Sequence, residues 1–356
     1  MHACGSRHAV ALLISCGSVQ RLAQPSLQAS TSPGFPEATE DNRLLFPDGR
    51  ALRLSPSSVS TFRQCQLLFL LRHIDRLPEP STPELAAGNL VHETLHALYQ
   101  LPPEQRTLGT SQHLFRERWR RQRRSHRYSP LFNLPSIDQE VESTQRDHRD
   151  VARERAWGLR AFESLRSYFS IEDPQQLEPL GCEERVAAEL SPRKEGDAPI
   201  PVTGVIDRID EAADSKGELA VIDYKTGRSP HPRFRDGAFF QLEMYALLLK
   251  KTGRWGGGAN SATLRLLFLG DAQVLQKKVT AQELEETGET LRDIWANMLE
   301  AFRGGREGFL PTQSPLCAYC AHKSRCPAFA GEQTVEATRP AETHVTNASV
   351  NLRRLS

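Results

Sequence analysis

An aspartate and a lysine stand two positions apart where a β-branched run ends, in the stretch AVIDYKTG at residues 220–227. Side chains alternate faces along a β-strand, so Asp223 and Lys225 are expected to point the same way. Asp207 ends an earlier apolar run, GVIDRID. A tight connection at residues 214–217 joins the two predicted strands, so Asp207 is expected to approach Asp223 across the sheet.

These residue types indicate metal-dependent chemistry on phosphodiesters. Two carboxylates held close together repel each other unless a cation neutralises them, and Mg²⁺ or Mn²⁺ prefers such oxygen ligands. The metal could polarise a phosphodiester and lower the pKa of a bound water, while Lys225 orients that water or stabilises charge on the phosphate. Alternatively, Asp207 and Asp223 are surface charges beside a turn, and Lys225 is their ion-pair partner. The apolar strand that precedes each motif favours the metal site.

Three cysteines in the C-terminal part of the chain have the spacing of metal ligands. Cys317, Cys320 and Cys326 form a C-x₂-C-x₅-C pattern in the stretch CAYCAHKSRC. A closed site needs four ligands, and the fourth is expected to be Cys65, with His322 as the alternative. From spacing alone, zinc is the ordinary expectation for this site.

Two histidines lie four residues apart, and so on one face of an expected helix, in the stretch HETLH. His92 and His96 match the H-E-x-x-H motif of zinc peptidases, which makes peptidase activity an alternative. No third ligand is evident, and a peptidase would leave the motifs at 207–245 unexplained. We take His96 to be a packing residue.

The elements that must position these residues alternate between helices and strands. A helix is predicted to start with Ser55 as its N-cap and Pro56 in its first turn. A second amphipathic helix is predicted over 86–100. The expected strands are 182–190, 200–210, 218–226 and 262–270, and two further helices are expected at 237–251 and 281–303. This order predicts an α/β fold with antiparallel neighbours in the middle of the sheet.

An arginine-rich segment at 105–170 predicts a helical insertion ahead of the sheet. Residues 116–127 alone carry seven arginines. This run is either a solvated helix face or a track for phosphate groups, with which arginine pairs well. In the second case the expected DNA contacts are Arg120, Arg121 and Arg124.

The chain of 356 residues is long enough for one elaborated domain with polar extensions. We expect a disordered leader at 1–50, a domain at 51–330 and a disordered tail at 331–356. No apolar run approaches the ~18–20 residues of a membrane helix, so no membrane partner is expected. The apolar run AVALLISCGS is too short to favour secretion, and a cytoplasmic location is expected. The remaining cysteines receive no functional role: Cys4, Cys16 and Cys182.

Four motifs, in the order GNLVHETLH, GVIDRID, IDYKTG and QLEMYALLL, resemble those of the PD-(D/E)xK nuclease superfamily, in its RecB-type exonuclease branch. The similarity extends from about residue 54 to residue 329. The resemblance implies a restriction-endonuclease-like core, a mixed sheet flanked by helices. It also implies that His92, Asp207 and Asp223 bind the metal. In the same family pattern, Lys225 is the catalytic lysine.

The resemblance extends to a helix and to the cysteines. Gln241 and Tyr245 match the family's Q-x-x-x-Y helix, where they would contact DNA or support the site from one helical face. In AddB and in CRISPR-associated adaptation nucleases, a lone upstream cysteine joins a C-terminal group of three to hold a [4Fe–4S] cluster. The resemblance therefore implies an iron–sulfur segment at 310–330 that binds a structural cluster together with Cys65.

The function implied is that of a metal-dependent exonuclease acting on single-stranded DNA ends in repair or recombination. No Walker A motif, G-x-x-x-x-G-K-[ST], occurs in the chain, so any helicase partner would be a separate protein. A non-cleaving nucleic-acid-binding module with the same fold and cluster is an alternative. The intact Asp207, Asp223 and Lys225 argue against it.

Overall fold

A mixed five-stranded sheet lies at the centre of the computed structural model, which describes residues 34–138, 147–212, 217–256 and 261–329. The strand order is β3-β4-β5-β6-β7. All neighbours are antiparallel except β5 and β6, which run parallel and are connected through helix α7. The strands are β3 Gly181–Leu190, β4 Ile200–Glu211, β5 Leu219–Lys225, β6 Ser261–Phe268 and β7 Gln273–Thr280.

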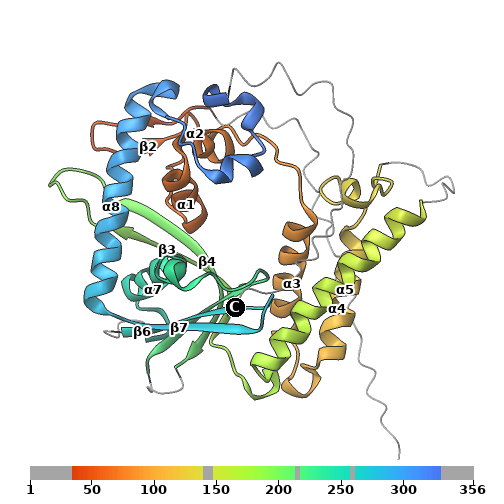
Figure 1. The fold of residues 1–356 in the computed structure, drawn as a ribbon. Helices are drawn as coiled ribbons and strands as arrows, with labels where there is room; N and C mark the ends of the chain where they lie inside the picture. The colour runs from red at the N-terminus through yellow and green to blue at the C-terminus, as the bar shows by residue number, and fades with distance from the viewer. Residues whose placement is uncertain (1–33, 139–146, 213–216, 257–260, 330–356) are drawn as a thin grey trace, which may run out of the picture.

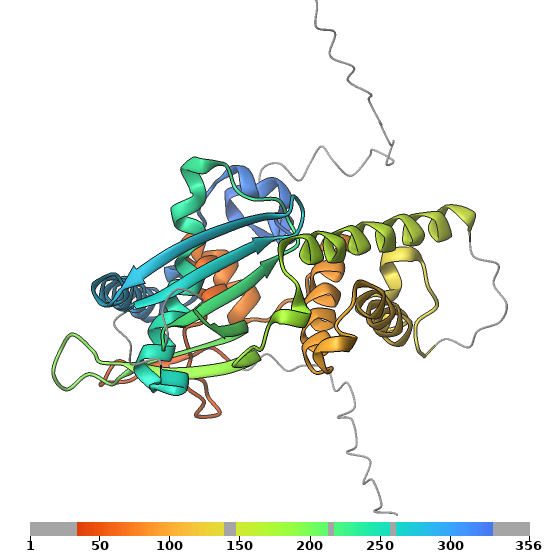
Figure 2. The same ribbon diagram turned by 90° about the horizontal axis from the view of Figure 1, so that it is seen from below.

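Helices cover both faces of this sheet (Figure 1). One face packs against α1 Pro56–Gln64, α7 Phe240–Thr252 and α8 Ala281–Arg303. The other face packs against α3 Pro83–Tyr99, α4 Leu108–Gln122 and α5 His148–Ile171. Figure 2 shows α3, α4 and α5 gathered on one side, with α5 reaching outward from the sheet. The expected α/β fold with a mixed sheet flanked by helices is confirmed.

Shorter elements complete the described chain. Within the described residues, no helix is both long enough and apolar enough to cross a membrane. The short strands and helices are β1 Glu37–Ala38, β2 Leu44–Leu45, α2 Gln66–Phe69, a π-helical turn Leu70–Ile74 and α6 Arg235–Ala238. Three 3₁₀ turns carry the C-terminal cysteine segment: Pro315–Tyr319, Lys323–Arg325 and Pro327–Phe329.

Strand β5 is buried on both faces, which explains its nearly continuous apolar sequence. Val221 belongs to the core under α7 and α8, whereas Ile222 and Tyr224 belong to the core under α3, α4 and α5. Asp223 and Lys225 both contact Gln241 of α7, so they share the face of Val221. The expected alternation along this strand is confirmed.

The start of α1 also agrees with the sequence. Ser55 caps the helix by accepting the N–H of Ser58, and Pro56 lies in the first turn. The ordered region, however, begins before residue 50. Residues 34–50 form β1 and β2, and Leu44 and Phe46 of this segment are buried in the core.

One strand of the central sheet, β7, is absent from the elements predicted from the sequence. Its sequence QVLQKKVT is largely polar, and β7 lies at the edge of the sheet. Lysines are common on edge strands because they discourage pairing with other chains, and they also weaken the apolar alternation that marks a strand. The remainder of the expected leader and tail, at 1–33 and 330–356, lies outside the described residues.

Candidate active site

A cavity of about 950 Å³ opens between α3, the strands β3, β4 and β5, and the start of α7. Five of the residues singled out from the sequence line it together: His92, Asp207, Asp223, Lys225 and Gln241. These residues come from four elements spread over about 150 positions of the chain. The fold therefore brings the expected catalytic and metal-binding residues to one place.

Helix α3 carries His92 into the cavity. Gly88 lies one turn earlier, where a Cβ would stand 3.3 Å from Thr226 Oγ1, so glycine lets the helix approach the end of β5. His92 Nδ1 lies 3.3 Å from Asp207 Oδ2, and its ring meets the Tyr224 ring edge-on. Burial opposes protonation of His92, but the hydrogen bond and the charge of Asp207 outweigh it and raise the pKa to about 9.

Asp207 lies inside β4, so the expectation that it ends its strand is wrong. The β4–β5 ladder pairs Arg208 with Ile222 and stops there, and the next position in this register sets Asp207 opposite Asp223. Asp207 Oδ2 accepts the backbone N–H of Tyr224 at 2.8 Å. The carboxylate of Asp207 thus accepts a backbone N–H that would otherwise bond to the neighbouring strand. This hydrogen bond holds Asp207 beside the buried Asp223 of β5.

Gln241 connects the residues of β5 to α7. Its Nε2 donates to Asp223 Oδ1 and to the Tyr245 hydroxyl, both at 2.9 Å. Its Oε1 accepts from Lys225 Nζ at 3.0 Å. Gln241 and Tyr245 share one face of α7, as expected from their spacing. Tyr245 supports the amide from behind and does not line the 950 Å³ cavity.

Asp223 is a buried carboxylate, 2% exposed. Its Oδ2 forms an ion pair with Lys225 Nζ at 2.6 Å, and no other polar group of the described residues donates a hydrogen bond to this oxygen. Burial, followed by the nearby charge of Asp207, raises the pKa of Asp223 to about 6. Burial and the neighbouring carboxylate of Asp207 therefore disfavour the ionised form of Asp223.

Strand β3 supplies a residue that the sequence analysis missed, Glu183. One carboxylate oxygen of Glu183 and the ligand atoms of His92 and Asp207 all lie within 4.8 Å of one another. Burial, followed by the charge of Asp207, raises the pKa of Glu183. Its backbone has φ 54°, a left-handed conformation that is uncommon in a strand. The pair Glu183–Glu184 in an otherwise alternating strand was the available sequence signal.

These donors fit a divalent metal ion. Carboxylate oxygens with one imidazole nitrogen are ligands that Mn²⁺ and Mg²⁺ accept, and Asp223 adds a buried carboxylate oxygen whose partner among the described residues is the ammonium group of Lys225. His96 lines the same cavity but does not belong to the group formed by His92, Glu183 and Asp207. The zinc-peptidase alternative therefore gains no support from this arrangement.

The arginines that line the cavity are Arg118 and Arg127. The three arginines named from the sequence lie elsewhere: Arg120, Arg121 and Arg124 are absent from this lining. Arg120 pairs with a glutamate one turn away on α4, and Arg124 donates to two backbone carbonyl groups. The direction of each arginine on α4 follows from the burial of Phe115 and Trp119, which fixes how the helix is turned. The number of arginines in the sequence does not predict which of them face the cavity.

Comparisons with known proteins identify the family of this chain. The model of a family described as the PD-(D/E)XK nuclease superfamily matches residues 53–327. A solved structure described as a "Putative exonuclease" from Eubacterium rectale is 12% identical, covers 84% of this chain and 94% of that chain, and has a TM-score of 0.41. The structure of SSO0001 is 17% identical, covers 51% of this chain and 81% of that chain, and has a TM-score of 0.26. A search of the curated proteins gave no match.

The family match spans the helices and strands that build the cavity, and the chain belongs to the PD-(D/E)XK nuclease superfamily.

Proposed function

We propose that this chain is a Mg²⁺- or Mn²⁺-dependent deoxyribonuclease of the RecB type that degrades single-stranded DNA from its ends during repair or recombination. One observation carries the proposal. His92, Glu183 and Asp207 converge on the cavity that also contains the buried Asp223 and the amine of Lys225. Membership of the superfamily supports nuclease chemistry and a nucleic-acid substrate.

Each polar group has a distinct role in this proposal. Asp223 would hold the metal together with His92, Glu183 and Asp207, and the metal would polarise the phosphodiester and activate water. Lys225 is 35% exposed, so it can reach a phosphate bound in the cavity. Its ammonium group would stabilise the negative charge that develops on the phosphoryl oxygens. The hydrogen bonds of Gln241 fix the direction of that lysine.

A second cavity, of about 810 Å³, adjoins the first and supports a path for a strand. Val205 and Gln241 line both cavities. Among the side chains that the structure describes, none that lines the second cavity is acidic, and the cavity presents serine and threonine hydroxyls and the guanidinium of Arg63. Arg63 lies over the ring of Phe240 at 5.0 Å. A cation beside an aromatic ring suits a single strand, because it offers contacts to both phosphate and base.

Arg63→Glu is expected to raise KM for a single-stranded oligonucleotide about tenfold while kcat changes less than about twofold, because the residue contacts the strand away from the reacting phosphate. Steady-state kinetics at fixed ionic strength measure both constants. Arg166→Glu on the exposed surface of α5 is the matched control and should leave KM unchanged. Equal KM values for the two variants would contradict the proposal that the DNA strand passes through the second cavity.

The proposed function is tested by a time course on end-labelled single- and double-stranded oligonucleotides, with anaerobically purified protein and Mn²⁺ or Mg²⁺. We expect products released from single-stranded ends, and no products in excess EDTA. Internal fragments as the first products would exclude exonuclease action. DNA binding without any cleavage, in either metal, would favour the non-cleaving module.

We also propose that the four cysteines hold a structural [4Fe–4S] cluster. Cys65, Cys317, Cys320 and Cys326 line one cavity between α2 and the C-terminal 3₁₀ turns. Two backbone N–H groups, of Leu68 and Thr312, point at Cys65 Sγ at 3.5 and 3.4 Å. Such N–H donors stabilise the negative charge of metal-bound thiolates.

One contact favours Cys65 over His322 as the fourth ligand. His322 Nε2 already pairs with Glu79 Oε1 at 3.0 Å, which makes Cys65 the better candidate. The choice of iron over zinc rests on the resemblance of the cysteine pattern to that of the iron–sulfur nucleases.

A further inference from the structure

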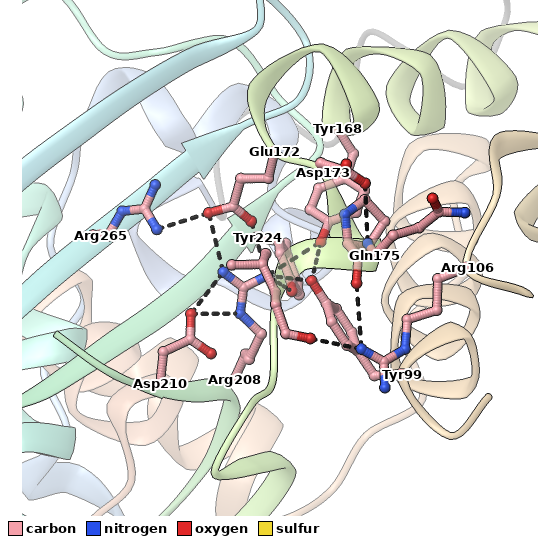
Figure 3. Close-up of polar contacts among 12 residues, drawn as sticks. Tyr99, Arg106, Tyr168, Glu172, Asp173, Gln175, Arg208, Asp210, Tyr224 and Arg265 are labelled. Atoms are coloured by element: carbon pink, nitrogen blue, oxygen red, sulfur yellow. Dashed lines mark hydrogen bonds and ion pairs between the residues drawn. The ribbon is translucent and has the colours of Figure 1, made fainter. Parts of the chain in front are cut away.

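A buried charged network lies behind the catalytic strands, on the face of the sheet that α3 and α5 cover (Figure 3). Its centre is Arg208, whose side chain is 0% exposed. Arg208 Nη1 donates to three hydroxyl groups, those of Tyr99 at 2.8 Å, Tyr168 at 3.1 Å and Tyr224 at 3.0 Å. Burial raises the pKa of Tyr99 to about 12, so this hydroxyl is neutral and can accept the hydrogen bond.

Two carboxylates balance the guanidinium. Arg208 Nη2 donates to Glu172 Oε1 at 3.0 Å, and Nε donates to Asp210 Oδ2 at 3.1 Å. A second arginine, Arg265 of β6, donates to Glu172 at 2.7 Å. Burial alone would raise the pKa of Glu172, but the two arginines outweigh it and hold the pKa below its usual value. The cluster thus contains two cations and two acidic groups.

The network and the candidate metal centre are built from the same three elements. Each of the elements α3, β4 and β5 carries one residue of the candidate metal centre and one residue of the network. The two residues are adjacent on the strands and two helical turns apart on α3. The pairs are His92 with Tyr99 on α3, Asp207 with Arg208 on β4, and Asp223 with Tyr224 on β5. The network therefore ties together the three elements whose spacing the metal ligands require.

Stability alone does not account for this network. Replacing buried ion clusters with apolar side chains of similar size is often neutral or stabilising, because charges lose hydration when they are buried. Asp210 Oδ1 is buried and has no hydrogen-bond partner among the described residues, and Glu172 Oε2 is held only by its ion pair with Arg208 Nη1 at 2.8 Å. What such a network does provide is a fixed relative position of the elements that it joins, since its donors and acceptors have specific directions.

We propose that Arg208, Glu172 and Tyr224 form a positioning network that sets the spacing of His92, Asp207 and Asp223, and thereby the metal affinity of the centre. The inference rests on the proposed function, because it assumes that these three residues bind the metal. It adds that the end of α5, which supplies Glu172, tunes the centre from behind the sheet. The helical insertion is thus part of the metal site's support.

Glu172→Gln tests this inference without changing a residue that lines the cavity. The variant loses the charge that pairs with Arg208 and Arg265, and we expect Mn²⁺ affinity of the folded protein to fall about tenfold, as for other residues that orient metal ligands. We also expect kcat to fall at unchanged KM for DNA. Titration calorimetry and Mn²⁺ electron paramagnetic resonance measure the affinity independently of cleavage.

Arg106→Gln is the matched control. Arg106 is also a buried arginine beside Tyr99, but it donates to backbone carbonyls of the segments that follow α3 and α5. Its loss should lower Tm and leave Mn²⁺ affinity unchanged. If Glu172→Gln lowers Tm in the same way with normal Mn²⁺ affinity, the network is only structural and the inference is overturned.

Tyr224→Phe keeps the test decisive if Glu172→Gln does not fold. This change removes one hydroxyl acceptor of Arg208 and keeps the ring that packs against His92. Weakened Mn²⁺ binding supports the inference, and normal binding overturns it. Wild-type protein that binds Mn²⁺ without cleaving DNA would contradict the proposed nuclease alone, whereas wild-type protein that binds no Mn²⁺ would overturn both.

Discussion

Asp223→Asn is expected to lower kcat by a factor of about 10³ or more while DNA binding changes little, because the centre loses the negative charge of a buried carboxylate and the strand path stays intact. Mn²⁺ affinity should fall in parallel. Single-turnover cleavage and fluorescence-anisotropy binding on the same oligonucleotide measure the two effects. Lys225→Ala should likewise abolish cleavage without abolishing DNA binding, since it removes the positive charge next to the phosphate.

The metal-free stability of the Asp223→Asn variant should move in the opposite direction. Burial and the charge of Asp207 raise the pKa of Asp223 to about 6, so at neutral pH its ionised form is held at a cost to folding. A neutral amide of the same shape removes that cost, and Tm of the metal-free protein should be unchanged or higher. Asp271→Asn, outside the cavity, is the control and should keep normal kcat. Normal cleavage by both the Asp223 and Lys225 variants would refute the assignment.

Cys65→Ala is expected to produce the largest loss of stability. The cluster would join α2 to a segment about 250 residues later, and a cross-link that closes a loop of this length stabilises a fold by about 5 kcal/mol in the chain-entropy model. The variant should lack visible absorption and unfold at a much lower temperature. Absorption spectra, iron analysis and thermal unfolding of anaerobically purified protein measure these changes.

Two further variants identify the ligands of this cluster. Cys182→Ala should retain iron and colour, since this cysteine lies away from the other four and burial raises the pKa of its thiol to about 12. A cluster that survives Cys65→Ala but is lost in His322→Gln would make the histidine the fourth ligand. Colourless wild-type protein that contains zinc would contradict the iron–sulfur assignment.

The placement of the site could be predicted where short-range rules decide it. Alternation along β5 sets the directions of Asp223 and Lys225, and hairpin pairing sets Asp207 opposite Asp223. Helical spacing puts Gln241 and Tyr245 on one face. These rules concern residues that are close together in the sequence. They can therefore be applied to one amino-acid sequence before its tertiary structure is known.

The residues that were missed depend on tertiary geometry. Glu183 reaches the centre through a left-handed backbone conformation, and the Glu183–Glu184 pair in the sequence does not by itself predict that conformation. Arg208 follows Asp207 directly in GVIDRID, but its burial among tyrosines of α3, α5 and β5 exists only once those elements have packed. The direction of each arginine on α4 likewise follows from how that helix docks.

The contact between α2 and the last described segment has a consequence for biosynthesis. Leu67 donates its N–H to the carbonyl of Leu310, and Phe69 stacks on Phe309. These partners of α2 leave the ribosome more than 200 residues after the helix itself, so the contact has a high contact order. Until that segment has been synthesised, the nascent chain exposes the apolar side chains of α2 that pack against it.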